Sequence, residues 1–289
     1  MKKNKDFKPM LAHVYQNQPI DWNQPVYMQP KLDGVRCIFT SNGAFSRTGK
    51  RFMNVKHIES ALQEMFKQNP WLILDGELYN HDLRDDFEKI ISLVRKQKPT
   101  RQDRSEARKM IQFHCYDYVF SSNGIVDKIE SDMNRYSDRM HQLNCSDMYG
   151  DYIKYVPSMR IKSSAEAKDK HKAFLNKGYE GSIIRLDGPY EQKRSKNLLK
   201  VKDFHDSEAT IVDWVEGKGK REGTIGKFIA QDVDGNQFGM PVMDNFKKLR
   251  KDFKLMQNWV GLVATFTYFE RTKRNSYRHP LFKALRNYE

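Results

Sequence analysis

The sequence lacks both the long apolar runs of a membrane protein and the paired cysteines of a secreted, disulfide-rich domain. No stretch approaches the roughly 18 apolar residues that a membrane span needs, and the charged start, MKKNKDFKPMLAHVYQ, is not followed by an apolar segment. The three cysteines are an odd number without metal-ligand spacing, and two of them lie in apolar, strand-like runs. We therefore expect a soluble, unsecreted chain whose cysteines are reduced core thiols: Cys37, Cys115 and Cys145.

Acidic residues are scarce relative to basic ones. Lys and Arg number 51 against 37 Asp and Glu, which gives a net charge of +14 and a pI near 9.5. A surface with this excess attracts polyanions. A basic surface kept for solubility is the alternative, but solubility alone does not favour Lys over Glu. The composition therefore indicates an anionic partner, with nucleic acid as the first candidate.

At 289 residues the chain is long enough for two compact domains. Over the first two thirds the apolar period switches between two and about 3.6, which predicts mixed α and β structure. Strands rich in β-branched and aromatic residues are expected at 35–40, 71–79, 112–120, 181–186 and 198–204. Four helices are expected between them: one from Asn54, one over Phe87 to Val94, one from the capping box Asp127 to Glu130 as far as Leu143, and one from Ser163 to Gly178.

The pattern changes after Phe204. Strand-like segments, EATIVDWVEG, GKFIAQDV and GLVATFTYFE, are separated by the Gly-rich GKGKREGTIG and by DVDGNQ, a hairpin signal. One short helix around Leu249 interrupts them. This arrangement predicts a small β-barrel with a helix, compatible with an oligonucleotide-binding (OB) fold. The predicted fold is therefore α+β in two domains, 1–204 and 205–289, with the boundary near residues 203 to 207.

The stretch QPKLDGVRCIF places Lys31 beside Asp33, Gly34 and Arg36 at the start of a predicted strand. An amine nucleophile must be neutral, whereas an ordinary lysine, with a pKa of about 10.4, is protonated at pH 7. Nearby cations would lower that pKa, and the sequence offers three: Arg36, Lys200 and Lys202. Gly34 would allow a tight turn after Asp33, whose carboxylate could hold a metal or orient the amine. This combination suits phosphoryl or nucleotidyl transfer.

The same residues carry a family resemblance. KLDGVR (31–36) resembles motif I, K-x-D-G-x-R, of the covalent nucleotidyltransferases, which include ATP-dependent DNA ligases, RNA ligases and messenger-RNA capping enzymes. Segments similar to motifs Ia, III, IIIa, IV and V follow in the family's order: SRTG (46–49), LDGELY (74–79), FHCYDYVF (113–120), EGSIIR (180–185) and LLKVK (198–202). FKPMLA (7–12), EGKGKREGTIG (216–226) and FERTKRNSYRHPLFKALR (269–286) resemble the small DNA ligases of bacteriophages. The resemblance spans nearly the whole chain.

The resemblance implies a nucleotide site. Lys31 would attack the α-phosphate of ATP and carry AMP, and Glu77 would contact the ribose or a metal. Tyr116 would stack on adenine, although Phe113 or Tyr118 are alternatives, since aromatic residues in strands usually fill the core. The remaining members of the implied site are Gln29 at the adenine amino group, Ile183 on the opposite face of the base, and Arg36, Lys200 and Lys202 at the phosphates. In the strand that carries the two lysines, the two-residue period predicts that Leu199 and Val201 face the core. An edge-strand glutamine is the alternative for Gln29.

The resemblance also implies a metal and a nucleic acid. Mg²⁺, for which Mn²⁺ can substitute, would neutralise the triphosphate, and its implied ligands are Glu180, Glu77 and Asp33. Arginines suit bidentate phosphate contact. The cations expected at the phosphates of a nick are Arg36, Arg47 and Arg194 in the first domain and Lys218, Lys220, Arg271 and Arg274 in the second. Solvated loops and surface ion pairs are the alternatives.

One departure concerns the end of the chain, RHPLFKALRNYE, which lacks the R-x-D-K of the family's motif VI; Arg278 and Arg286 are the candidates to replace it. No separate DNA-binding domain is expected before motif I. The resemblance implies a monomeric DNA ligase in a bacterial or phage-infected cytoplasm. It would seal nicks in duplex DNA through lysyl-AMP and 5′-adenylated DNA, with a hinge near residues 203 to 207. The alternatives are an RNA ligase or capping guanylyltransferase, or a non-catalytic nucleic-acid-binding protein.

Overall fold

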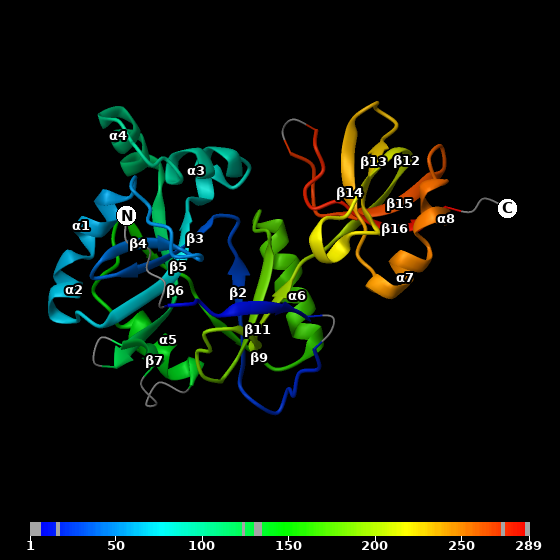
Figure 1. The fold of residues 1–289 in the computed structure, drawn as a ribbon. Coiled ribbons are helices and arrows are strands. Elements are labelled where there is room, and N and C mark those ends of the chain that lie inside the picture. Colours follow the sequence, from blue (N-terminus) through cyan, green and yellow to red (C-terminus); the bar gives the residue numbers. More distant parts are fainter. Residues whose placement is uncertain (1–6, 16–17, 123–124, 130–134, 273–274, 287–289) are drawn as a thin grey trace. The chain divides into compact units, whose positions relative to one another are not determined.

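The computed structural model describes residues 7–15, 18–122, 125–129, 135–272 and 275–286. The chain divides into two compact units, Met1–Val201 and Lys202–Glu289, which are described separately (Figure 1). The division falls between Val201 and Lys202, whereas the sequence predicted a boundary near residues 203 to 207. Among the described residues, no helix combines the length and the apolar character needed to cross a bilayer.

The first unit contains two mixed but mainly antiparallel sheets. One has the order β1-β11-β10-β2-β9, with bounds Leu11–Val14, Arg194–Val201, Gly181–Leu186, Val26–Lys31 and Met159–Ile161. The other has the order β4-β3-β5-β6-β7, with β8 paired to β6; the bounds are Gly43–Ser46, Val35–Thr40, Leu72–Tyr79, Gln112–Ser122, Ile125–Ile129 and Ile153–Tyr155. The two parallel pairs, β1 with β11 and β6 with β8, join strands far apart in the sequence.

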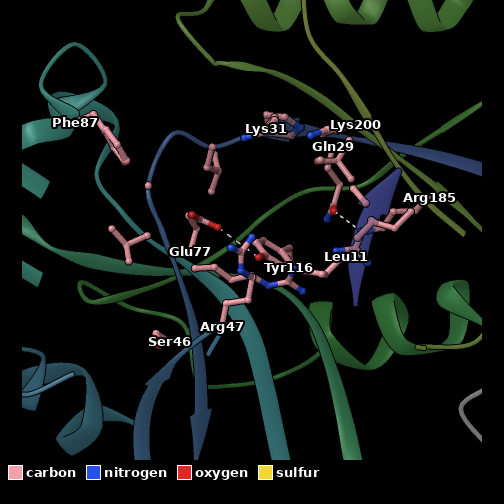
Figure 2. Close-up of a pocket in the computed structure, with 18 of the residues that line it drawn as sticks. Leu11, Gln29, Lys31, Ser46, Arg47, Glu77, Phe87, Tyr116, Arg185 and Lys200 are labelled. Atoms are coloured by element: carbon pink, nitrogen blue, oxygen red, sulfur yellow. Dashed lines mark hydrogen bonds between the residues drawn. The ribbon is translucent and has the colours of Figure 1, made fainter. Parts of the chain in front are cut away.

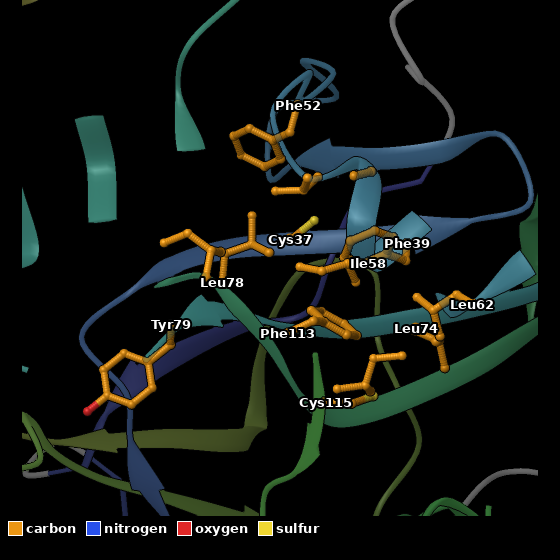
Figure 3. Close-up of a cluster of buried hydrophobic side chains, with 14 of the residues drawn as sticks. Cys37, Phe39, Phe52, Ile58, Leu62, Leu74, Leu78, Tyr79, Phe113 and Cys115 are labelled. Atoms are coloured by element: carbon orange, nitrogen blue, oxygen red, sulfur yellow. The ribbon is translucent and has the colours of Figure 1, made fainter. Parts of the chain in front are cut away.

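A large apolar core holds the second of these sheets against helices (Figure 3). Cys37 and Phe39 of β3, Phe113 and Cys115 of β6, and Ile58 are fully buried in it. The helices of this unit are α1 Lys56–Ala61, α2 Gln63–Gln68, the 3₁₀ turn η2 His81–Leu83, α3 Phe87–Val94, α4 Arg101–Met110, α5 Tyr136–Asn144 and α6 Ser164–Asn176. The prediction of core thiols is confirmed for Cys37 and Cys115, whereas Cys145 is exposed.

Most predicted strands of this unit are present within a few residues, because alternating apolar patterns follow the pleat. The strand expected at 198–204 is wrong at both ends: β11 begins at Arg194, where it pairs with Leu11 of β1, and ends at Val201. The helix expected from Asp127 is wrong in its first half, since Ile125–Ile129 forms β7 against the end of β6 and the helix begins only at Tyr136. Residues 130–134 lie outside the described part.

The second unit is a five-stranded antiparallel sheet with the order β14-β13-β12-β15-β16. The bounds are β12 His205–Glu216, β13 Ile225–Gln231, β14 Gln237–Pro241, β15 Val263–Tyr268 and β16 Leu281–Leu285, with η4 Gly219–Arg221, α7 Phe246–Lys251 and α8 Phe253–Gln257. Phe228, Met240 and Phe266 are fully buried at its centre. The end strands β14 and β16 approach each other, and the described residues form no hydrogen-bonded ladder between them. The sequence predicted β12, β13 and β15 and missed the shorter β14 and β16.

Candidate active site

A cavity of about 520 Å³ opens in the first unit, lined by both of its sheets (Figure 2). Its walls come from the ends of β2, β10 and β11 on one side and from β3, β5 and β6 on the other. The cavity brings together predicted site residues that are far apart in the sequence: Gln29, Lys31, Arg36, Arg47, Glu77, Tyr116, Ile183, Arg194 and Lys200. Exposed Arg95 and partly buried Phe87 also line it, and the sequence did not predict them.

Strand register explains how one wall is built. Gln29 of β2 lies opposite Ile183 of β10, which lies opposite Lys200 of β11. Directly opposite residues on neighbouring strands point to the same face of a sheet, so these three side chains form one row. Leu199 points the other way and is fully buried in the core, as predicted from the two-residue period. The strand therefore presents Lys200 to the cavity while its apolar neighbours anchor the sheet.

Lys31 ends β2, and its Nζ contacts the carboxylate of Glu180. The Lys31 side chain is 22% exposed and the Glu180 side chain 4%. The two residues are also joined through the backbone, because the Glu180 N–H donates to the Lys31 carbonyl at 3.1 Å. Gly181 has a φ of +153°, and a Cβ there would lie 2.4 Å from the Val201 carbonyl oxygen, so only glycine fits beside Glu180. Motif I and motif IV thus form one local structure.

Gly34 is required for a different reason than the predicted turn. A Cβ at this position would lie 2.5 Å from the Leu78 carbonyl oxygen and 2.7 Å from Cγ of Glu77. The loop after Lys31 therefore passes directly over β5, and this close approach excludes any side chain. The glycine thus lets the loop after Lys31 pass against the strand that carries Glu77.

The opposite wall holds Glu77 and Tyr116. Glu77 of β5 lies opposite Arg36 of β3, and the hydroxyl of Tyr116 donates to Oε2 of Glu77 at 3.3 Å. A register shift between Asp75 and Gly76 leaves Tyr116 without a direct partner on β5. Such bulges re-aim side chains and are frequent beside active sites. Tyr116 lines the cavity, whereas Phe113 and Tyr118, the alternatives for the adenine-stacking residue, are buried in the core.

Arg36 lines the cavity but is already engaged. Its Nε donates to Oδ1 of Asp75 at 2.9 Å, and its Nη1 donates to the Met10 carbonyl at 2.6 Å. Asp75 is buried and also accepts from the hydroxyl of Tyr190 at 2.6 Å. The guanidinium of Arg36, which was predicted to bind phosphates, therefore also links β3 to β5 and to the N-terminal segment. Arg47 and Arg194, by contrast, are exposed at the cavity.

The charges in the cavity act on one another. Burial raises the pKa of Glu77 from 4.5 to about 8, against the lowering effect of Lys31 and Arg36. Burial lowers the pKa of Lys200, and the positive charges of Lys31 and Arg194 lower it further. Perturbed titrations of this kind cluster at functional sites. The cavity lining thus combines Lys31, Lys200 and Glu77, and Glu180 contacts the amine of Lys31.

Only two of the three predicted metal ligands, Glu77 and Glu180, lie near Lys31 and the cavity. Glu77 lines the cavity, and Glu180 lies next to it through its contact with the amine of Lys31. Asp33 lies in the β2–β3 loop, outside the described residues that line the cavity. The described part of the chain contains no group of three His, Cys, Asp or Glu side chains able to hold a metal. Two carboxylates still fit Mg²⁺, because this ion commonly takes one or two carboxylates together with substrate phosphates.

The sequence did not predict a buried charge network behind the cavity. Arg185 is 4% exposed, lines the cavity, and donates from Nε to Oε1 of Gln29 at 2.8 Å. It also donates from Nη1 to Asp117 at 2.6 Å, and Asp117 accepts from Nε of Arg139 at 2.8 Å. The available signal was a charged residue inside each of two apolar strands, YDYVF and GSIIR, since unpaired buried charges are rare.

Several predicted residues lie in the second unit. Lys202 follows the end of β11, and its Nζ lies 4.4 Å from the ring centre of Phe269. Arg271 forms ion pairs with Asp232 at 3.3 Å and Asp234 at 3.1 Å, so this guanidinium has partners within the unit. The other predicted cations divide as follows: Arg278 pairs with Glu270, Arg286 pairs with Glu208, Lys218 and Lys220 are exposed, and Arg274 lies outside the described residues.

Comparison with known proteins agrees with the sequence motifs. Residues 9–202 match the family model described as ATP dependent DNA ligase domain. A DNA ligase of African swine fever virus is 29% identical over 210 residues, which are 68% of this chain and 46% of the viral protein. A DNA ligase of Haemophilus influenzae is 26% identical over 228 residues, which are 78% of this chain and 75% of that protein. The chain thus spans about half the length of the viral relative.

The fold also has relatives among solved structures. A Lig E DNA ligase superposes with a TM-score of 0.76 at 23% identity, covering 96% of this chain and 99% of the other. This likeness establishes the fold, a mixed α+β nucleotidyltransferase domain with an OB-fold domain, and confirms the predicted fold class. The family model covers most of the chain, including the motifs around Lys31, Glu77, Glu180 and Lys200. The chain belongs to the ATP-dependent DNA ligase family.

Proposed function

We propose that this chain is a monomeric ATP-dependent DNA ligase that seals nicks in duplex DNA through a lysyl-AMP intermediate. In this proposal, the first unit is the adenylation domain and the second is an OB-fold domain that helps to grip the duplex. The observation that carries the proposal is the position of Lys31: its amine lies in the cavity in contact with Glu180, with Lys200 and Glu77 lining the same cavity.

In the first step, the neutral amine of Lys31 attacks the α-phosphorus of ATP. A nitrogen–phosphorus bond forms while the bond between the α-phosphorus and the bridging oxygen breaks, so pyrophosphate leaves and the amine loses one proton. Glu180 orients the amine through its contact with Nζ. Lys200 lies on the same wall and stabilises the negative charge that develops on the α-phosphate.

The rest of the cavity positions the nucleotide. Tyr116 and Ile183 offer a ring and an aliphatic surface for the base, and Gln29 lies beside Ile183 in the strand row. Glu77 and Glu180 are the residues that would hold Mg²⁺ or Mn²⁺, with the phosphates completing the coordination. When bound, the metal supplies neutralisation of the triphosphate charge. Holding the reacting groups in one geometry removes much of the entropic barrier to the transfer.

The later steps use the same cavity. The 5′-phosphate of the nick attacks the phosphorus of lysyl-AMP, the nitrogen–phosphorus bond breaks, and the Lys31 amine regains its proton. The 3′-hydroxyl then attacks the 5′-phosphorus, loses its proton, and releases AMP as the strand closes. Exposed Arg47 and Arg194 offer bidentate contacts to the phosphates at the nick. The net charge of +14 supports binding along the backbone.

The test is transfer of AMP from the protein to a defined nick. Protein labelled with radioactive ATP and Mg²⁺ is mixed with a nicked duplex, and label is followed on protein, on DNA and as free AMP. We expect label to pass to the 5′-phosphate and then to be released with sealing, whereas a nick with a 5′-hydroxyl leaves the label on the protein. Labelling by GTP alone, or transfer only to RNA, would contradict the proposal and favour the capping or RNA-ligase alternatives.

A further inference from the structure

The side-chain amide of Gln29 makes two hydrogen bonds, one as a donor and one as an acceptor. Its Nε2 donates to the Val156 carbonyl at 3.0 Å, and its Oε1 accepts from Nε of Arg185 at 2.8 Å. Gln29 is 1% exposed and Arg185 is 4% exposed, so water does not compete for these bonds. Both residues nevertheless line the cavity that contains Lys31 (Figure 2).

These partners allow the amide only one orientation. An arginine Nε–H can only donate and a backbone carbonyl can only accept. Turning the amide of Gln29 by 180° would set an N–H against the N–H of Arg185 and an oxygen against the oxygen of Val156. Each of these buried groups would then lose its hydrogen-bond partner, which is costly. The donor and the acceptor of Gln29 are therefore fixed in space.

Arg185 is itself immobilised. Its Nη1 donates to Oδ2 of Asp117 at 2.6 Å, and its guanidinium carbon lies 4.7 Å from the ring centre of Tyr136. Asp117 is fully buried and accepts from Nε of Arg139 at 2.8 Å and from the Tyr118 N–H at 2.9 Å. Burial raises the pKa of Asp117, but Arg139 and Arg185 outweigh burial and leave the pKa lowered, so the carboxylate stays charged. The network therefore joins residues of three elements, β6, α5 and β10.

The cavity lining contains both cations and apolar side chains. Lys31 and Lys200 can bind phosphates, whereas Tyr116 and Ile183 present an aromatic and an aliphatic surface suited to a flat base. Gln29 lines this cavity, and its two hydrogen bonds to the described residues use one N–H and one oxygen lone pair of the amide, which leaves one of each for a ligand. A base that pairs with both must offer a donor to the oxygen and an acceptor to the N–H. The 6-amino group and N1 of adenine match, while the 6-oxo group and N1–H of guanine or hypoxanthine are reversed.

We infer that Arg185, held by Asp117, is a positioning residue that fixes the Gln29 amide and thereby makes the cavity select 6-aminopurine over 6-oxopurine nucleotides. The inference rests on the proposed function only in that the nucleotide enters this cavity. Gln29 reads the base, and Arg185 acts through Gln29. Loss of Arg185 frees the amide to rotate, so Gln29 can then pair with the 6-amino and N1 edge of adenine or with the 6-oxo and N1–H edge of hypoxanthine.

The experiment compares ATP with inosine triphosphate, which has the 6-oxo edge but lacks the 2-amino group of GTP. Nucleotide transfer to Lys31 is followed by intact mass, and the ratio of kcat/KM for the two nucleotides is measured for the wild type, Arg185→Lys and Arg160→Lys. Arg160 is an exposed arginine on the neighbouring strand β9 and serves as the control. We expect the wild type and Arg160→Lys to prefer ATP by about 100-fold, and Arg185→Lys to lose at least about tenfold of that preference, mainly through slower ATP transfer.

The selectivity ratio is measured on one sample, so a smaller fraction of folded protein does not change it. Should Arg185→Lys fail to fold, Gln29→Met, which keeps the shape but has no donor or acceptor amide, decides the matter: its preference for ATP should fall to about that of Arg185→Lys or below. Equal use of ATP and inosine triphosphate by the wild type, or undiminished selectivity in the folded variants, would overturn the inference. Absence of any nucleotide on Lys31 from either triphosphate would instead overturn the proposed function.

Discussion

The side chains of Lys31 and Glu180, 149 residues apart in the sequence, meet because their backbones are also paired: the Glu180 N–H donates to the Lys31 carbonyl at 3.1 Å. The antiparallel register of β2 and β10 continues from this bond, with Lys31 opposite Gly181. The nucleophile and its carboxylate are therefore positioned by strand pairing rather than by flexible loops. Residues on paired strands are held more accurately than residues on loops, which favours a reaction that depends on orientation.

Glu180→Gln tests the need for the charge beside the amine. The amide keeps the shape and one hydrogen bond to Lys31 but cannot balance the positive charge or bind a metal strongly. We expect the rate of AMP transfer to Lys31 to fall by about 100-fold or more, with little change in the free energy of unfolding. Rapid quench followed by mass measurement gives the rate, and a rate within about twofold of the wild type would show that the carboxylate has no chemical role.

Gly34→Ala tests the close approach of the lysine loop to β5. The new Cβ would lie 2.5 Å from the Leu78 carbonyl oxygen, so the loop or the strand must shift. We expect a loss of about 2 kcal/mol in the free energy of unfolding and slower AMP transfer. Gly150→Ala is the matched control, because a Cβ there meets nothing within 4 Å. Equal stability of the two variants in urea titrations would contradict this packing argument.

The raised pKa of Glu77 predicts how the free energy of unfolding changes with pH. Its pKa is raised by burial from 4.5 to about 8, so between these values the folded protein holds a proton that the unfolded chain releases. The contribution of this proton to stability is complete below about pH 4.5 and is lost as the pH rises through about 8. Between pH 5 and 8, the free energy of unfolding of the wild type should therefore fall relative to that of Glu77→Gln. A difference between the two proteins that stays constant over this range would rule out the raised pKa.

Substitutions of the cations in the second unit should have two different effects, one on DNA binding and one on thermal stability. Lys218 and Lys220 are exposed, so changing both to Ala should weaken binding to nicked DNA and reduce the salt dependence by about 0.9 log unit per lost phosphate contact. Arg271 pairs with Asp232 and Asp234, so Arg271→Ala should mainly lower thermal stability because buried Asp232 loses a charged partner. Fluorescence anisotropy over a salt series, together with thermal unfolding, measures both effects. A normal melting temperature with a reduced salt slope for Arg271→Ala would reverse this assignment.

The sequence predicted those parts of the fold that depend on local period and spacing. The strands at 35–40 and 181–186 appear with the expected bounds, and the two-residue period correctly separated Lys200 at the cavity from buried Leu199. Lys31 was proposed as the nucleophile because KLDGVR resembles motif I of the covalent nucleotidyltransferases and five further motifs follow in the family's order. The strand bounds, by contrast, needed only neighbouring residues.

What the sequence did not predict depends on partners far along the chain. Arg185 reaches Gln29 across 156 residues, and no local pattern shows that their strands are paired. The segment after residue 124 is a different case, because it forms a hairpin with the end of β6 only a few residues earlier, and these strand hydrogen bonds override the capping pattern at Asp127. Arg271 looked like a free cation in a basic run because its acidic partners, Asp232 and Asp234, lie on a hairpin more than thirty residues earlier.

The most direct test of the account is the mass of the intact protein after incubation with ATP and Mg²⁺, followed by peptide mapping. We predict the addition of one AMP, joined to Lys31 by a bond that is stable to alkali and labile to acid, and no addition to Lys31→Ala. The neighbouring Lys200→Ala should still place its residual AMP on Lys31. An unmodified wild-type protein, or AMP mapped to a residue other than Lys31, would contradict the account.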